Sequence, residues 1–429
     1  MNTNSFNYII LCLISLVILN SCAPGFKKVI KKDKVFKQAQ SALIVYDPAA
    51  KKTLFEYNAD KYFTPASNTK ILTFYAGLKS LNDSVVTFKY SIKGDSLIFS
   101  STGDPSFLNP KFNDSTAHNF LKTSKRKLYY INSNWNDEFY GPGWAWDDYN
   151  YAFAAERSAF PIYGNLVTFK HENQKEELLS IPSYFQDCVH YTDLVSTPMR
   201  SIDANLFHLP KDVPETYSRQ SPFKTSQELS LQLLSDSLKK PIQVIKNDAS
   251  IILDKELKTI SMDTLYKEML HESDNFIAEQ ILLMAAHQLS DTLKAEKAIN
   301  NIKKSFLKGL KDEIYWVDGS GLSRYNLLTP RSLVFVLDKI HQERSEDDLT
   351  KLFPTGGSSG TLKGMFTETP AFIFAKSGSL RNNYSLSGYM ISRSGKFLIF
   401  SFMNSNYTQP SQLLKTRMEE ILTGVRNKY

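Results

Sequence analysis

Hydrophobic and polar residues follow two patterns along the chain, one typical of strands and the other of helices. The stretch "SALIVYDPAAKKTLFEYN" (41–58) predicts two strands around a turn at Asp47-Pro48, because strand-forming residues flank turn formers. The next stretch, "SNTKILTFYAGLKS" (67–80), follows Pro65 and has the spacing of a helix that buries one side. Three more strand patterns and an amphipathic helix close the chain, at 371–380, 384–392, 396–404 and 411–426.

The middle of the chain has a different sequence pattern and composition. Residues 85–225 carry short strand-like runs, many Tyr, Trp and Asn residues, and turn signals such as "GDPS" and "YGPGW". Helical patterns return afterwards: "TSQELSLQLLSDSLKK" (225–240) opens with a Thr cap and a Glu three places on, which is a capping box. A helical stretch over 264–290 is interrupted at "ESDN", and another, over 329–342, begins at Thr-Pro.

These patterns predict an α+β protein with a five-stranded antiparallel sheet flanked by helices. The terminal helix is expected on one face, and the other helices on the opposite face. Residues 23–85 and 222–429 would form the domain that contains this sheet, and 86–221 an inserted β-rich domain. A chain of 429 residues is long enough for more than one domain. The net charge of +7 is mild and spread along the chain, so it does not indicate a nucleic-acid partner.

The N-terminus predicts export. The apolar run at 8–19 has the length of a signal-peptide core, and "LNSC" after it resembles the lipobox of bacterial lipoproteins. Residues 1–22 would be a lipoprotein signal peptide, with Cys22 lipidated, although an uncleaved anchor stays possible. The basic segment "KKVIKKDKVFK" (27–37) would then be a tether on the membrane surface. Cys188 would be a buried thiol without a disulfide partner.

Three short motifs of polar residues follow one another along the chain. Ser67 and Lys70 form a Ser-x-x-Lys at a predicted helix start, Ser273 and Asn275 a Ser-x-Asn on a helical connection, and Lys376 begins a Lys-Ser-Gly on a strand. Each motif is weak alone, since Ser-x-x-Lys also occurs at 124–127 and 237–240. Together they are the three-part site of serine acyl-transferring enzymes that bind β-lactams.

The chemistry of these residues agrees with that site. A spacing of three places Ser67 and Lys70 side by side on a helix, and a serine hydroxyl needs a base within reach. Lysine can be that base if its pKa falls, and Lys376 is the candidate second cation that would lower it. Ser273 is expected to bridge Lys70 and the leaving amine. The backbone N–H groups of Ser67 and Ser379 would face the developing oxyanion.

With these motifs the chain resembles the D-alanyl-D-alanine carboxypeptidases/endopeptidases of the class C low-molecular-mass penicillin-binding proteins. The matching segments follow one another along nearly the whole mature chain: "TPASNTKILT", "GPGWAWDDYNYAF", "ESDNFIAEQ", "VDGSGLSRYNLLTP", "GTLKGMF" and "AKSGSL". The long insert between the first two catalytic motifs is also a family feature. Ser377 stands where threonine is usual, which keeps the hydroxyl.

The resemblance implies a serine β-lactamase/penicillin-binding transpeptidase-like fold and hydrolysis of D-Ala-D-Ala bonds or D-alanyl cross-links in peptidoglycan. It also implies covalent inhibition by β-lactams and needs no metal or organic cofactor. Lys376 and Ser377 would hold the terminal carboxylate of the substrate, with Gly378 and Ser379 on the same strand, and Asn275 would hold the peptide backbone. In the insert, the resemblance assigns contact with the substrate side chain to Asp148 and Phe153.

Other functions are still open to test. A relative acting on other D-amino acid peptides, esters or β-lactams would share these motifs, whereas a non-catalytic wall-binding lipoprotein would not need them intact. "GGSSG" (356–360) fits the nucleophile elbow of α/β-hydrolases, but no histidine follows His341, so the required order fails. The histidines show no zinc-peptidase spacing. The expected location is the cell envelope, on the periplasmic side of a membrane.

Overall fold

The structure, a computed structural model, describes residues 25–171, 178–246 and 251–429. Its central element is a five-stranded antiparallel sheet in the order β14-β15-β16-β1-β2, as predicted. The strands of this sheet are β1 (Gln40–Asp47), β2 (Lys52–Tyr57), β14 (Ile373–Leu380), β15 (Asn383–Ile391) and β16 (Phe397–Ser405). The first two strands therefore join the last three across the whole chain, with Leu43 opposite Phe402.

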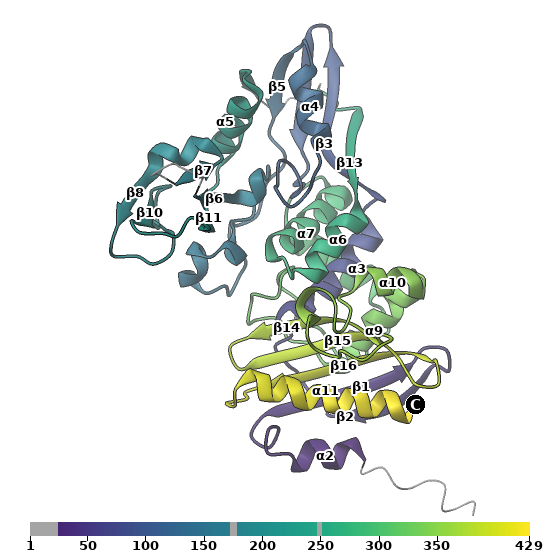
Figure 1. The fold of residues 1–429 in the computed structure, drawn as a ribbon. Helices are drawn as coiled ribbons and strands as arrows, with labels where there is room; N and C mark the ends of the chain where they lie inside the picture. Colours follow the sequence, from purple (N-terminus) through teal and green to yellow (C-terminus); the bar gives the residue numbers. More distant parts are fainter. Residues whose placement is uncertain (1–24, 172–177, 247–250) are drawn as a thin grey trace, which may run out of the picture.

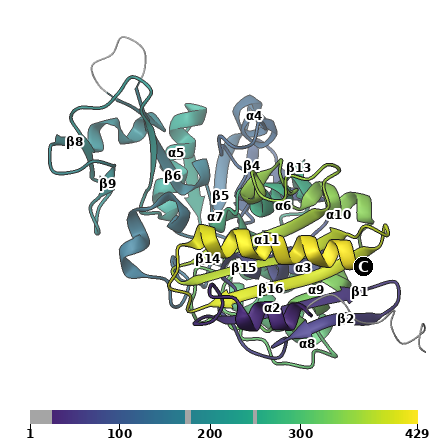
Figure 2. The same ribbon diagram turned by 60° about the horizontal axis from the view of Figure 1, so that its bottom comes forward.

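Alternation along β1 gives the sheet two apolar faces. Leu43 and Val45 pack towards the C-terminal helix α11 (Ser411–Lys428) and the N-terminal helix α2 (Phe26–Lys32). Ala42 and Ile44 face the opposite side, because successive side chains of a strand point to opposite faces. The helices on that side are α3 (Lys70–Ser80), α6 (Met262–His271), α7 (Asn275–Ser290), α8 (Ala295–Phe306), α9 (Pro330–His341) and α10 (Glu346–Leu352). Figures 1 and 2 show the sheet between these two helical layers.

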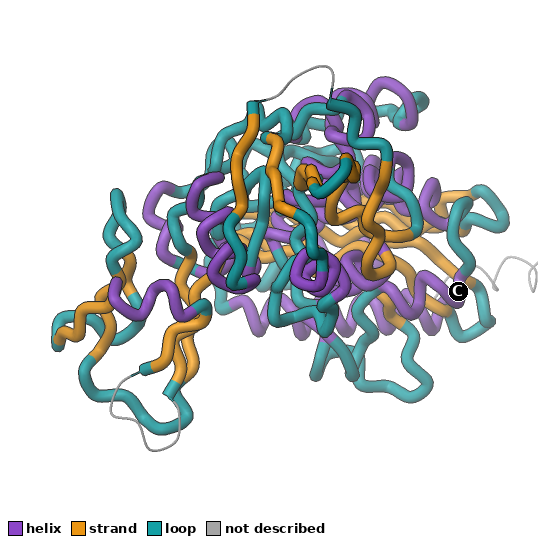
Figure 3. Tube along the Cα trace, turned by 90° about the horizontal axis from the view of Figure 1, so that it is seen from above, coloured by secondary structure: helices purple, strands orange, loops and turns teal. Residues whose placement is uncertain are grey.

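The insert is rich in strands, as predicted, and lies at the far end of the molecule from α2 (Figure 1). Its main sheet has the order β12-β5-β4-β3-β13, and two three-stranded sheets have the orders β11-β6-β7 and β8-β10-β9. Figure 3 shows the two small sheets to one side of the molecule. The strands are β3 (Ser84–Lys93), β4 (Ser96–Ser101), β5 (Lys127–Ile131), β6 (Leu166–Lys170), β7 (Leu179–Ile181), β8 (Val189–Thr192), β9 (Met199–Arg200), β10 (Phe207–Pro210), β11 (Ser218–Pro222), β12 (Ile242–Ile245) and β13 (Lys255–Ser261). Two helices, α4 (Thr116–Thr123) and α5 (Gln227–Leu238), pack beside these strands.

The structure moves the predicted boundary of the insert. Strands β12 and β13 pair with β5 and β3, so the main sheet of the insert continues to residue 261 rather than ending at 221. The boundary was misplaced because these pairings join segments far apart in sequence, and no local pattern encodes them. The cap of α5 was also wrong by one residue, since Ser226 rather than Thr225 accepts the hydrogen bond from Leu229 N–H.

The structure corrects two predictions, one about the 27–37 segment and one about Cys188. The 27–37 segment is not a free tether, because α2 is folded onto the catalytic domain with Ile30 and Phe36 buried. Cys188 is unpaired, but it is only half-buried. Cys22 lies outside the described residues. None of the described helices is long and apolar enough to cross a bilayer.

Candidate active site

Ser67 lies where the chain turns into α3. It sits in the single-turn helix η1 (Ala66–Thr69), which continues directly into α3. Ala66, just before it, adopts a left-handed backbone with φ 49°, an unfavourable conformation for a residue with a Cβ. Two glycines fit closely against this turn. A Cβ on Gly321 would lie 1.9 Å from the Ala66 oxygen, and one on Gly378 would lie 2.9 Å from the Ser67 nitrogen.

The Lys70 amine is buried and makes three hydrogen bonds. Its Nζ lies 3.0 Å from Ser67 Oγ, 2.6 Å from Asn275 Oδ1 and 2.6 Å from the Ser320 carbonyl oxygen. The last two partners can only accept. As an ammonium, Lys70 can donate to all three oxygens. Once neutral, it keeps two N–H groups for Asn275 and Ser320, and its lone pair can accept from the Ser67 hydroxyl. The arrangement therefore suits an amine that takes a proton from Ser67.

Burial explains the acidity of both lysines. It lowers the pKa of Lys70 to about 8, against the opposing charges of Asp318, Asp274 and Glu279. Burial also lowers the pKa of Lys376 well below its usual range, and the charge of Lys70 lowers it further. The expected repulsion between the two cations thus acts on Lys376, whereas loss of hydration is the main cause for Lys70.

The second motif lies at the start of α7. Asn275 is the first residue of that helix, and Asp274 caps it by accepting from Ile277 N–H at 2.9 Å. The Asn275 side chain joins two parts of the site, because Oδ1 accepts from Lys70 while Nδ2 donates to the Phe153 carbonyl at 2.9 Å. Ser273 is partly exposed and held at φ 58°. No hydrogen bond joins its hydroxyl to Lys70 among the described residues.

The third motif lies on the edge strand β14, which packs against η1. The Asn68 side chain donates to the Lys376 carbonyl at 2.8 Å and ties the two motifs together. Lys376 Nζ donates to the Ser377 carbonyl at 2.7 Å, and Ser377 Oγ donates to Thr361 Oγ1 at 2.7 Å. Ser379 is exposed, one residue beyond the glycine that touches the Ser67 backbone.

Sequence reasoning missed a buried carboxylate pair behind the catalytic lysine. Glu279 accepts from the N–H groups of Gly319 and Ser320, at 2.9 and 2.7 Å, and thereby aims the Ser320 carbonyl at Lys70. Burial and the nearby charge of Asp318 raise the pKa of Glu279 to about 7, against the opposing effects of Arg157 and of the hydrogen bond from Ser320. Arg157 lies 3.5 Å from Glu279. The "DGSG" pattern was the available signal, although it was interpreted only as part of the site wall.

Asp318 organises that wall. Its carboxylate accepts from the N–H groups of Gly321 and Ser323 and from the Asn326 side chain, at 2.9, 2.8 and 2.7 Å. It also accepts from Trp144 Nε1 at 2.9 Å, which brings the insert motif onto the catalytic domain. The insert therefore forms one side of the site.

The two insert residues singled out by the sequence lie differently. Phe153 reaches the site through its backbone, while its ring is exposed and stacks on Tyr151 at 5.3 Å. Asp148 is half-buried. Burial and the charge of Asp147 raise its pKa, and Arg324 counteracts them. Arg324 is exposed on the loop that follows Asp318.

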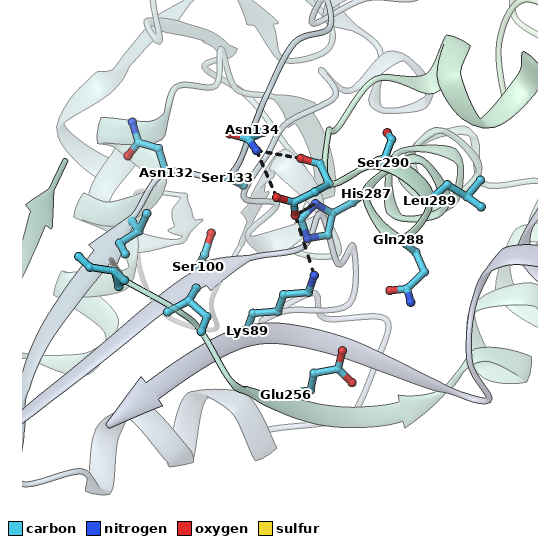
Figure 4. A pocket seen from close by; sticks show the side chains of 14 residues that line it. Lys89, Ser100, Asn132, Ser133, Asn134, Glu256, His287, Gln288, Leu289 and Ser290 are labelled. Carbon is cyan, nitrogen blue, oxygen red and sulfur yellow. Dashed lines mark hydrogen bonds and ion pairs between the residues drawn. The ribbon is translucent and has the colours of Figure 1, made fainter. Parts of the chain in front are cut away.

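A separate cavity of about 790 Å³ lies at the other end of α7. Lys89, Asn134 and His287 line it (Figure 4), and each of these three side chains contacts Asp291. Its lining contains none of the predicted site residues. The 16 residues of α7 span roughly 24 Å at ~1.5 Å per residue, so this cavity is distinct from the site at Asn275.

The fold and the convergence of the three motifs define the class of serine enzymes that react through Ser-x-x-Lys, as β-lactamases and penicillin-binding proteins do. The chain belongs to the D-Ala-D-Ala carboxypeptidase 3 (S13) family, whose model matches residues 26–425. It is thus a serine peptidase of the DD-carboxypeptidase type.

Individual relatives agree with this assignment. The D-alanyl-D-alanine carboxypeptidase DacB of Haemophilus influenzae is 24% identical over 418 residues, which is 87% of each chain. The carboxypeptidase DacB of Mycolicibacterium smegmatis is 30% identical over 165 residues, 35% of each chain. The crystal structure of penicillin binding protein 4 from H. influenzae superposes with a TM-score of 0.70 at 21% identity, over 89% of this chain and 93% of that chain. These likenesses confirm the predicted fold and family.

Proposed function

We propose that Ser67 is the nucleophile that cleaves D-Ala-D-Ala bonds, and D-alanyl cross-links, in peptidoglycan peptides. The main support is the position of the Lys70 amine, which is buried 3.0 Å from Ser67 Oγ and donates its two other hydrogen bonds to acceptors. Ser67 Oγ would form a bond to the carbonyl carbon of the penultimate D-Ala, and the C–N bond would break. Water would then hydrolyse the ester and release the shortened peptide.

The proton follows a path set by the same residues. It would pass from Ser67 to the neutral Lys70 amine during attack, and then to the departing nitrogen. Ser273 is the proposed relay in that second step, supported by its position two residues before Asn275. Rotation of the Ser273 hydroxyl needs no movement of the backbone. With substrate bound, the hydroxyl would therefore bridge Lys70 and the leaving amine, a contact to Lys70 that the free protein lacks.

The β14 edge would hold the substrate. The Lys376 amine and the Ser377 hydroxyl would bind the terminal carboxylate, the hydroxyl turning its proton from Thr361 Oγ1 to the substrate, and Gly378 allows the strand to approach Ser67 closely. Carboxylate binding would stabilise the charged form of Lys376, whose pKa burial has lowered. The N–H groups of Ser67 and Ser379 would stabilise the oxyanion.

Substrate choice is proposed to lie in the insert. Many wall peptides carry a side chain that ends in a free, cationic amine. Asp148 would form a charge-assisted hydrogen bond with that amine, and Phe153 would flank its methylene stem. The position of the Phe153 backbone against Asn275 supports this placement. Arg324 would have to yield its interaction with Asp148 when the amine binds.

A labelled penicillin tests the nucleophile. β-Lactams resemble the substrate and should acylate Ser67. A crystal structure of the H. influenzae relative contains a β-lactam. Mass spectrometry of the labelled protein should find the adduct on the peptide with Ser67, and D-Ala release from a D-Ala-D-Ala peptide should stop once it forms. An adduct on Ser358 of the "GGSSG" loop would overturn the assignment.

Attachment to a membrane is a separate part of the proposal. Cys22 would carry a lipid and become the first residue after removal of residues 1–21, so that the enzyme would work at a membrane surface in the cell envelope. Support comes from the "LNSC" sequence and from the wall substrates of the family. Metabolic labelling with an alkyne-bearing fatty acid should mark the wild-type chain and leave Cys22→Ala unmarked.

A further inference from the structure

The net positive charge of this protein comes mainly from one short segment, rather than being spread along the chain as the overall composition suggested. Six lysines and one aspartate fall within residues 26–37, so this short segment carries +5 of the net charge of +7. The lysines, which we call the α2 basic face, are Lys27, Lys28, Lys31, Lys32, Lys34 and Lys37, and all six are exposed. The rest of the chain is therefore nearly neutral.

The segment that carries these lysines is fixed to the catalytic domain. Ile30 and Phe36 are buried beside β1, β15 and α11, and Phe26 packs edge-on against Phe55 with ring centroids 5.6 Å apart. Asp33, its single acid, accepts from Arg417 Nε at 2.7 Å. The only nearby negative charge within the segment is thus already paired.

Helical spacing directs the lysines outward. Lys28 and Lys32 are four residues apart and each lies two residues from Ile30, so they share the face opposite Ile30, while Lys27 and Lys31, also four apart, lie along its exposed flank. Lys428, at the end of α11, lies over the Phe26 ring at 5.5 Å and extends the basic surface. Figure 2 shows α2 and α11 lying next to each other across the outer face of the sheet.

We propose that the α2 basic face binds an anionic phospholipid surface and holds the enzyme in one orientation. A flexible tether would only limit the distance from the membrane, whereas a docked helix also fixes the angle. Because the insert lies at the end of the molecule opposite α2 (Figure 1), it would project away from the bilayer towards the wall. This inference adds to the lipid at Cys22 in the proposed function but does not depend on it.

The attraction expected from this surface is electrostatic. Each lysine near an anionic bilayer strengthens binding by about fivefold at moderate salt, and the effect falls off within a Debye length of about 10 Å. Binding should therefore weaken as salt rises. The alternative partner is an anionic wall polymer, which could also use the basic cluster of the insert: Lys122, Lys125, Arg126 and Lys127.

The test uses the chain from Ala23 onward, which has no lipid and keeps every described element. One variant changes Lys27, Lys28, Lys31 and Lys32 to Gln, and the matched control changes the four residues of the insert cluster to Gln. Both variants lose four positive charges. Co-sedimentation with vesicles containing phosphatidylglycerol, and with neutral phosphatidylcholine vesicles, measures binding. Penicillin acylation in solution should be normal in both variants, which separates this proposal from that of the active site.

The α2 variant should lose binding to anionic vesicles by roughly 600-fold, the product of about fivefold for each of four lysines, while the insert variant should bind like the parent protein. Equal losses in the two variants would overturn the proposal, as would binding of the parent protein to an anionic polysaccharide but not to vesicles. Hydrogen exchange of the parent protein provides a second measure that needs no variant. Vesicles should protect residues 26–37 and leave the insert unchanged, and the reverse pattern would also refute the orientation.

Discussion

The pH dependence of acylation gives a sharp test of Lys70 as the base. Burial lowers the pKa of Lys70 to about 8 from its usual 10.5. At pH 7, an amine with the lowered pKa is neutral in about one molecule in ten, against about one in 3,000 for an ordinary lysine. Burial therefore enlarges the reactive population about 300-fold near neutral pH.

The expected profile follows from this population. The rate constant for acylation by a chromogenic or fluorescent penicillin should rise about tenfold per pH unit below pH 7 and level off above about pH 8. Lys70→Arg keeps a charge that cannot readily be removed, so its rate should fall by orders of magnitude and its profile should lose the inflection. A profile flat through this range in the wild type, or an Arg variant with a near-normal rate, would refute the assignment.

The same pKa has a consequence for stability. Because the pKa of Lys70 is lower in the folded than in the unfolded protein, the unfolded chain binds more protons between about pH 8 and 10.5. The free energy of unfolding should therefore rise with pH across this window, and Lys70 contributes about 3 kcal/mol to that rise. Denaturant unfolding of the wild type and of Lys70→Met should show it, since the variant should have a flatter pH dependence. Equal slopes would mean that Lys70 is not buried as a neutral amine.

Four further substitutions test the rest of the site and the anchor. Ser67→Ala should abolish penicillin labelling and D-Ala release while circular dichroism and the melting temperature stay close to wild type; residual labelling would place the nucleophile elsewhere. Glu279→Gln removes a negative charge that raises the pKa of Lys70. The inflection of the acylation profile should therefore move to lower pH, and the plateau rate should fall. An unmoved inflection would show that Glu279 has no electrostatic effect on Lys70. Asp148→Asn should lower kcat/KM by about tenfold or more for amine-bearing wall peptides, which corresponds to ~1.5–3 kcal/mol, yet barely change acylation by a penicillin without the amine; equal losses on both substrates would remove the specificity role. Cys22→Ala should move the protein out of the membrane fraction or leave its signal uncleaved, and unchanged processing with full retention would favour an uncleaved anchor.

Much of the fold was encoded locally. The strand-forming residues on both sides of the turn at Asp47-Pro48 predicted β1 and β2. The helical spacing after Pro65 predicted the helix over 67–80, which the structure forms as η1 and α3. The break at "ESDN" was predicted as well, and it marks the change from α6 to α7. The order of the three motifs was sufficient to predict the family.

Other features depended on distant contacts. The pairing of β12 and β13 with the insert, and the docking of α2 on the outer face of the sheet, join segments whose sequences give no sign of their partners. A seven-residue basic helix also has too little apolar surface for its docking to be predicted from its own pattern.

The chemistry of the site could likewise be predicted only in part from the sequence. The residue types and spacing of Ser67 and Lys70 were enough to propose a nucleophile and a base, because three residues of helix bring them side by side. The pKa of Lys70 was not available from the sequence, since it depends on burial and on the carboxylates of Asp318, Asp274 and Glu279, which reach it from other segments. Nor could spacing reveal that Glu279 holds the Gly319–Ser320 backbone and aims a carbonyl at the amine. Sequence alone thus determined which groups could react, whereas tertiary packing decided their hydration and hydrogen-bond partners, and through these which of them holds a proton at neutral pH.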